Sequence, residues 1–182
     1  MAEKRKADRL DEANESNEAT EADLIRGCTE IIEGCVYLCK GDTYIKMCGN
    51  GKGFANERRW YRKLNNLNKG SPIYDMFLHP EITRSALIFK PNGNLISLHE
   101  LAREKYITVR FLELVMVELK GMLQLLHKEG IYHNDIHDRN VLYDTDTSEL
   151  YFIDLEKMSS ADTGGDNDSL EELRESIMDP ID

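Results

Sequence analysis

The sequence of 182 residues predicts an α+β fold in which short antiparallel strands alternate with amphipathic helices. Two β-rich runs, at residues 36–39 and 44–47, flank the turn signal Gly41-Asp42 and predict a hairpin. Apolar side chains recur at spacings of three and four over residues 108–128, which is typical of a helix with one buried face. The length favours one compact domain with tails.

The net charge of −11 lies in the two ends of the chain. Residues 1–25 hold 4 basic and 8 acidic side chains, residues 161–182 hold 1 and 8, and residues 26–160 hold 18 of each. An acidic chain is a poor nonspecific ligand for DNA, RNA or anionic lipid. We therefore expect neither a nucleic-acid partner nor a membrane partner.

Two features bear on the compartment of the protein. No apolar run approaches the roughly 20 residues that span a bilayer, and no apolar stretch follows the basic cluster at residues 4–6. We therefore expect no secretory signal and a cytoplasmic or nuclear location. The cysteines Cys28, Cys35, Cys39 and Cys48 form no CxxC pair, and we expect them to be reduced. A zinc site and a disulfide are the two alternatives.

The first half of the chain predicts strands around one helix. Residues 1–25 contain no aromatic side chain and predict an acidic disordered tail. After the hairpin, a glycine-rich break at residues 49–53 leads into residues 54–67, whose apolar stripe predicts a helix. Residues 76–83 and 86–90 predict two more strands, and residues 97–104 a short helix.

The second half predicts the long helix, three short strands and a polar end. Thr108 can cap the long helix, and Gly130 stands just past its end. Strands are predicted at residues 131–132, 141–143 and 150–153. In the acidic tail at residues 161–182, the capping-box pair Ser169 and Glu172 predicts a last helix that ends near residue 178 and packs on the rest of the chain or on a partner.

The most informative motif follows the long helix. Residues 133–140 read His-Asn-Asp-Ile-His-Asp-Arg-Asn, and after the strand–turn–strand unit residues 153–156 read Ile-Asp-Leu-Glu. This order resembles the catalytic loop and metal-binding segment of the protein-kinase-like superfamily, H-x-D-x-x-x-x-N followed by a hairpin and an aspartate. Taken alone, the polar residues would be typical of a turn, but a turn explains neither the preceding helix nor the later aspartate.

The resemblance implies ATP and Mg²⁺ as cofactors and a role for each polar residue. Asp135 would orient the acceptor hydroxyl and take its proton, and Asn140 would supply an amide oxygen to the metal ion. Asp154 would hold Mg²⁺ against the phosphates of ATP. His133 would brace the loop rather than take part in the chemistry.

The upstream residues resemble the smaller lobe of a kinase. Lys46, in the apolar strand context Tyr-Ile-Lys-Met, resembles the lysine that contacts the α- and β-phosphates, and Glu57 resembles its ion-pair partner on the αC helix. Phe89 would mark the hinge where adenine docks. For Lys46 an exposed edge strand, and for Glu57 a solvated helix face, are the alternatives.

The implied fold is therefore bilobal and protein-kinase-like. It has a small antiparallel β N-lobe with an αC helix at residues 26–92 and a truncated, mostly α-helical C-lobe at residues 93–160. No G-x-G-x-x-G precedes Lys46; Gly34 and Gly27 are single candidates. The short remainder after Asp154 resembles minimal kinases of the RIO- and Bud32-like type.

The catalytic-loop string also resembles that of aminoglycoside and choline phosphotransferases and of bacterial sugar or lipid kinases. The histidine that these enzymes share corresponds to His137, at the place where protein kinases usually carry lysine. His137 would be either a phosphate or hydroxyl contact or a loop histidine bonded to backbone. We expect a minimal serine/threonine protein kinase with nucleotide and protein substrates or partners. A small-molecule kinase and a non-catalytic kinase-like regulatory module are the alternatives.

Overall fold

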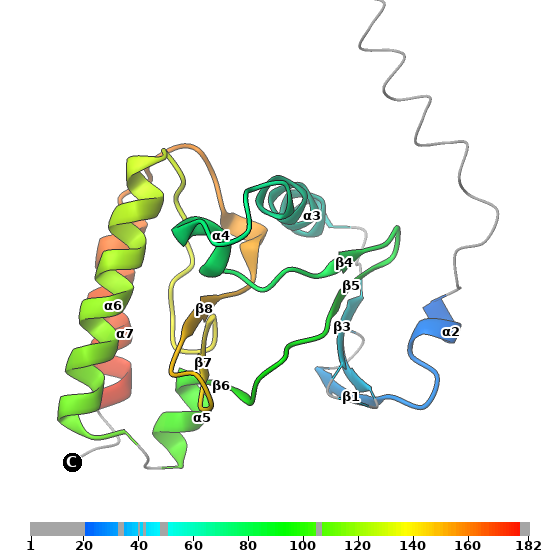
Figure 1. Ribbon diagram of the computed structural model, residues 1–182, viewed down its shortest axis with the longest axis horizontal. Helices are drawn as coiled ribbons and strands as arrows, with labels where there is room; N and C mark the ends of the chain where they lie inside the picture. The colour runs from blue at the N-terminus through cyan, green and yellow to red at the C-terminus, as the bar shows by residue number, and fades with distance from the viewer. Residues whose placement is uncertain are drawn as a thin grey trace, which may run out of the picture.

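The computed structural model describes residues 21–32, 35–39, 41, 43–47, 51–104 and 107–178. Residues 1–20 of the tail predicted at residues 1–25, the basic cluster, Gly34 and Cys48 lie outside this part of the chain, whereas residues 21–24 of that tail form a helix. Within it, a five-stranded sheet stands at one side, a pair of long helices at the other, and a three-stranded sheet between them (Figure 1). The α+β class is confirmed.

The five-stranded sheet is antiparallel, with strands in the order β1-β2-β3-β5-β4. Its strands are β1 (Thr29–Ile32), β2 (Val36–Cys39), β3 (Thr43–Met47), β4 (Glu81–Ile82) and β5 (Ala86–Phe89). The short helix α2 (Glu21–Leu24) precedes it, and α3 (Lys52–Asn65) and α4 (Pro72–Asp75) lie between β3 and β4 in the chain. The hairpin between β2 and β3 is confirmed.

The second half of the molecule is built on a three-stranded antiparallel sheet. Its strands are β6 (Leu95–Ser97), β7 (Val141–Asp144) and β8 (Leu150–Phe152). The helices are α5 (Leu98–Arg103), α6 (Val109–Lys128), the 3₁₀ turn η2 (Leu155–Lys157) and α7 (Gly165–Met178). Ser97 caps α5 through a capping box with Glu100, and Thr108 caps α6 as predicted.

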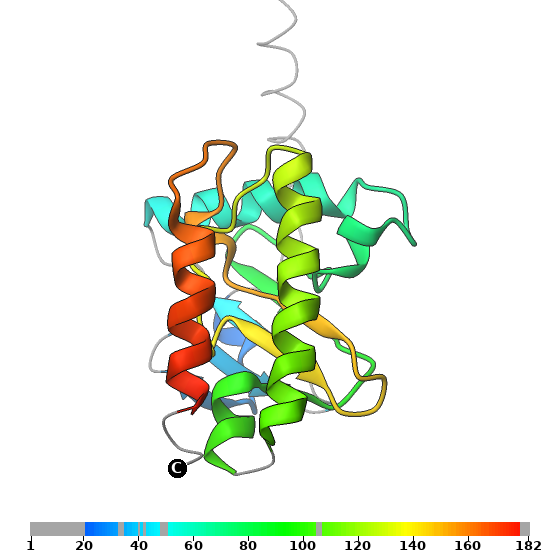
Figure 2. The same cartoon turned by 90° about the vertical axis from the view of Figure 1, so that its left-hand side faces the viewer.

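Helices α6 and α7 lie side by side and run in opposite directions in front of the three-stranded sheet (Figure 2). Leu170, Leu173 and Ile177 of α7 are buried in the same core as the apolar face of α6. Of the two predicted alternatives for this helix, packing on the rest of the chain or on a partner, the structure shows the first. No helix in the described part of the chain has the length and apolar character needed to cross a bilayer.

Three elements differ from their predictions. Residues 131–132 form no strand, because Tyr132 makes only an isolated bridge with Ser159. The strand predicted at residues 76–83 shrinks to β4, and Phe77 instead bridges Phe152 of β8. Helix α7 begins four residues before the capping-box serine, with Asp166 and Asp168 in its first turn, where carboxylates favour the helix dipole.

The expectation of reduced cysteines is wrong for one pair. Cys28 and Cys39 form a disulfide, with their Cα atoms 4.2 Å apart. The antiparallel register explains this pairing, because Thr29 of β1 stands opposite Leu38 of β2 and the two cysteines are the next residues outward. Their thiols are consequently not available as zinc ligands. Cys35 is a free cysteine.

The apolar face of α6 forms part of the core against which the loop at residues 133–140 lies. Leu119 is 0 % exposed, whereas Leu114 on the same helix is 64 % exposed. We expect Leu119→Ala to lower the free energy of unfolding by about 2–5 kcal/mol, the cost of lost burial plus a cavity. Leu114→Ala is the matched control and should change it by no more than about 0.5 kcal/mol. Urea unfolding measures both, and equal losses would contradict the assigned burial.

Candidate active site

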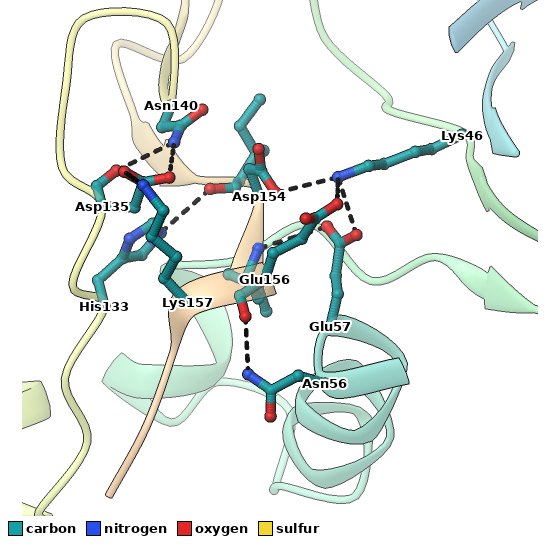
Figure 3. Close-up of polar contacts among 11 residues, drawn as sticks. Lys46, Asn56, Glu57, His133, Asp135, Asn140, Asp154, Glu156 and Lys157 are labelled. Carbon is teal, nitrogen blue, oxygen red and sulfur yellow. Dashed lines mark hydrogen bonds and ion pairs between the residues drawn. The ribbon is translucent and has the colours of Figure 1, made fainter. Parts of the chain in front are cut away.

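The site is organised by Lys46, which stands between two buried residues of β3, Ile45 and Met47. Its Nζ lies 2.8 Å from Glu57 Oε2 and 3.0 Å from Asp154 Oδ1 (Figure 3). Burial lowers the pKa of Lys46, but the attraction of Glu57 and Asp154 outweighs this effect and raises it above its usual value. The side chain is therefore a partly buried permanent cation, and not the exposed edge-strand lysine of the alternative interpretation.

Glu57 is held inside the molecule by the chain that follows β8. Its side chain is 1 % exposed, and the backbone N–H of Leu155 donates a hydrogen bond of 3.3 Å to its Oε1. Burial raises the pKa of Glu57, and Lys46 opposes that rise. The alternative of a solvated helix face does not apply to this residue.

A second contact between α3 and η2 fixes the relative position of the two segments. Asn56 Nδ2 donates to the carbonyl oxygens of Glu156 and Met158, at 2.9 and 2.8 Å. Trp60 Nε1 donates to Met158 O at 2.7 Å. These bonds hold the carboxylates of Glu57, on α3, and Asp154, just before η2, close enough to share the Lys46 ammonium.

Asp154 stands at the turn between β8 and η2, with φ 61° and ψ 73°. This left-handed conformation is uncommon for residues other than glycine, and aspartate is one of the few that tolerate it. Glu156, which the sequence analysis did not single out, brings a third carboxylate to within 3.2 Å of Lys46 Nζ.

Asp135 and Asn140, in the loop predicted to be catalytic, are brought together by hydrogen bonds. Asn140 Nδ2 donates to the Asp135 carbonyl oxygen at 3.0 Å and to Asp135 Oδ2 at 3.4 Å. The other carboxylate oxygen, Oδ1, lies 2.7 Å from Lys157 Nζ. The hydrogen bond to Asp135 raises the pKa of Lys157. Lys157 was not identified as part of the site in the sequence analysis.

His133 takes the bracing position that the resemblance implies. It is 0 % exposed, and its Nε2 lies 3.0 Å from the carbonyl oxygen of Ile153. Burial lowers the pKa of His133, so the ring is held neutral. Its Nε2–H can donate to Ile153, which links the catalytic loop to the residue before Asp154.

Asp166 is the most important residue that sequence reasoning missed. It lies in the first turn of α7 with a side chain only 2 % exposed. Its carboxylate accepts hydrogen bonds from the backbone N–H groups of His133 and Asn134, at 3.0 and 2.6 Å. His127 Nε2 lies 2.8 Å from the same carboxylate. Asp166 thus holds the start of the loop at residues 133–140 in place through its backbone N–H groups.

Two predicted residues are not part of this cluster. The ring of Phe89 packs edge-on against Tyr61 at a centroid distance of 5.6 Å, at the end of β5, and its role as an adenine contact stays a prediction. His137 Nδ1 accepts a hydrogen bond of 3.2 Å from the backbone N–H of Arg139, in agreement with a loop histidine bonded to backbone.

Three carboxylates of the site, which also contact Lys46, could hold a metal ion. Glu57, Asp154 and Glu156 each offer a carboxylate oxygen, and these atoms lie within 4.8 Å of one another. The amide nitrogen of Asn140 is engaged with Asp135, which leaves its Oδ1 as the atom for a metal. Carboxylate and amide oxygens are hard ligands of the kind that Mg²⁺ prefers.

The two sheets and the helices around them form a kinase-like fold. The family model described as "Lipopolysaccharide kinase (Kdo/WaaP) family" matches residues 78–180, which is more than half of the chain. The chain belongs to this family, whose name places it among the kinases.

A solved structure supports the fold. The kinase PK-1 of the Cydia pomonella granulovirus superposes with a TM-score of 0.51 and 21 % sequence identity. The match covers 68 % of this chain and 47 % of that chain, so the present chain spans about half the length of the viral kinase. At this identity the likeness concerns the fold alone. No curated protein sequence is significantly similar to the chain.

Proposed function

We propose that this protein is an ATP- and Mg²⁺-dependent phosphotransferase that transfers the γ-phosphoryl group to a serine or threonine hydroxyl of a protein. The observation that carries the proposal is the position of Lys46 Nζ, 2.8 Å from Glu57 and 3.0 Å from Asp154. A strand, a helix and the segment after β8 each contribute one charged group to one point. This arrangement suits the neutralisation of phosphate oxygens, which is the main demand of phosphoryl transfer.

Each residue has a defined part in the transfer. The acceptor hydroxyl oxygen attacks the γ-phosphorus, the bond from that phosphorus to the β–γ bridging oxygen breaks, and ADP leaves with its electron pair. Asp135 orients the hydroxyl and takes its proton. Lys46 balances the charge of the α- and β-phosphates. Asn140 and Asp154 would hold Mg²⁺, which when bound neutralises further phosphate charge.

A second candidate acceptor is a saccharide hydroxyl. The name of the matching family, lipopolysaccharide kinase, favours it. The groups proposed to act on ATP would be the same, and only the acceptor would differ.

We expect the wild-type protein to incorporate label from γ-labelled ATP in the presence of Mg²⁺, and Asp154→Ala to lose this incorporation. The carboxylate of Asp154 is proposed both to hold the metal and to position Lys46, so its loss removes two contributions at once. Labelling is measured with a protein extract and with sugars, choline-like amino alcohols and aminoglycosides as separate acceptors. The acceptor that is labelled decides between the two candidates.

A thermal unfolding measurement with ATP and Mg²⁺ separates catalysis from binding. Ligand at 100 times its dissociation constant stabilises a protein by roughly 2.7 kcal/mol. Asp162→Ala, at an exposed position after η2, is the control and should keep both labelling and stabilisation. If the wild-type protein shows neither, the enzyme proposal fails and a non-catalytic regulatory module takes its place.

A further inference from the structure

A pocket of about 340 Å³ lies beside the catalytic loop and has no part in the transfer described above. Its walls come from α5, from the loop between Asp135 and Asn140, and from α7. The lining residues are His99, Ala102, Arg103, His137, Asp138, Arg139 and Ser176.

The three walls are tied together by Asp138. Its Oδ2 lies 2.7 Å from His99 Nδ1 and accepts a hydrogen bond of 3.4 Å from Ser176 Oγ. Its carbonyl oxygen accepts a bond of 3.0 Å from the backbone N–H of His99. The single carboxylate of the pocket is thus already bonded, and it is only 15 % exposed.

The remaining polar groups of the pocket are cations and donors. Arg103 and Arg139 are exposed, and neither forms an ion pair with any other residue that the structure describes. Because His137 Nδ1 accepts the backbone N–H of Arg139, the neutral ring carries its proton on Nε2 and can donate it. Two arginines and a hydrogen-bond donor therefore line one hollow of a chain whose net charge is −11.

The pocket is close to the proposed transfer site. His137 follows Asp135 by two residues, and because one residue spans at most about 3.6 Å, their Cα atoms lie within about 7 Å of each other. An anion in the pocket and a hydroxyl at Asp135 can therefore belong to one acceptor molecule. The exposed positions of Arg103, Arg139 and Ser176 open the pocket to solvent, which suits an extended chain lying across the surface.

We propose that this pocket binds a carboxylate or phosphate side chain of an acidic peptide whose neighbouring serine or threonine is held at Asp135. The inference rests on the proposed function and adds its substrate class. Arginine recognises both anions through its planar fork of donors, so the chemistry of the pocket accepts either source. Lysine-rich segments would meet two like charges there.

The first test measures binding and does not depend on turnover. Fluorescence anisotropy follows a labelled serine peptide flanked by glutamate, a second flanked by phosphoserine, and a third flanked by glutamine. We expect the two anionic peptides to bind about 10- to 100-fold more tightly than the neutral one, the range of charge-assisted hydrogen bonds. The double variant Arg103→Glu/Arg139→Glu should lose this difference.

The matched control is Arg62→Glu/Arg110→Glu, which changes the net charge equally at exposed positions outside the pocket and should keep the preference. Equal binding of all three peptides to the wild-type protein, or loss of the preference in both double variants, would overturn the proposal. If inorganic phosphate displaces the labelled peptides as strongly as the unlabelled peptides do, the pocket binds a small anion, and this result would also overturn the proposal.

The second test uses catalysis and separates the two proposals. Where labelling occurs, the Arg103→Glu/Arg139→Glu variant should lower kcat/KM for the anionic peptides more than for the neutral peptide, so that the preference for anionic peptides is lost. If no peptide is labelled while the anionic peptides still bind with the expected preference, the protein-kinase proposal fails and the pocket stands. If all are labelled without preference, the pocket proposal fails and the function stands.

Discussion

Replacing Asp135 by asparagine is expected to lower kcat by about 10²–10⁴, the contribution of a positioned general base. The amide keeps the size of the side chain and can still accept a hydrogen bond from Asn140, so the loop should keep its shape. It cannot take the proton of the acceptor hydroxyl, and it no longer pairs with Lys157. Steady-state rates with saturating ATP measure the effect.

The affinity for ATP distinguishes this loss from a damaged fold. Because Asp135 contacts neither Lys46 nor Glu57 in the described contacts, we expect the dissociation constant of ATP to change by less than about threefold, well under the 1.4 kcal/mol of a tenfold change. Asp75→Asn, at an exposed position on α4, is the control. A rate close to that of the wild-type protein in Asp135→Asn would remove this residue from the mechanism.

Asp166→Ala is expected to lower the free energy of unfolding by about 3–5 kcal/mol, as when one partner of a buried charged network is removed. The substitution leaves the N–H groups of His133 and Asn134 and the His127 ring without their acceptor. Since displacement of a catalytic group by about 1 Å can cost about 10²-fold, we also expect activity to fall at temperatures where the variant is folded.

Asp168→Ala is the matched control for this prediction. It removes an exposed carboxylate from the same helix two residues later and should change the free energy of unfolding by no more than about 1 kcal/mol, the helix-dipole contribution of such a group. Urea unfolding compares the two variants. Asp166→Asn, which keeps one acceptor oxygen, should lie between wild type and Asp166→Ala, and an alanine variant as stable as the control would show that the loop does not depend on this anchor.

Local signals predicted much of this fold. Periodicity located α3 and α6, because each buries one face, and Thr108 satisfies a free amide at the start of α6. The Lys46–Glu57 contact was implied by the resemblance to kinases, and it agrees with the need of a lysine in an apolar strand for a nearby carboxylate.

Long-range contacts account for what the sequence did not predict. Asp166 lies in a polar run typical of a loop, and its importance depends on the packing of α7 against α6. The Cys28–Cys39 bond depends on strand register, which composition does not specify. At residues 131–132, β-propensity is overridden because the chain enters the catalytic loop instead of a sheet.

The ion pair between Lys157 and Asp135 weakly blocks the position proposed for the acceptor hydroxyl when no acceptor is bound. Lys157 is 63 % exposed, and exposed ion pairs contribute about 0.2–1 kcal/mol. A closed state of that depth lowers the apparent affinity of an acceptor by at most about sixfold, because affinity scales with the fraction of open molecules. Binding of the acceptor can therefore break this ion pair with no separate activating event. The affinity of the acceptor would then depend on the fraction of molecules in which Lys157 is not paired with Asp135.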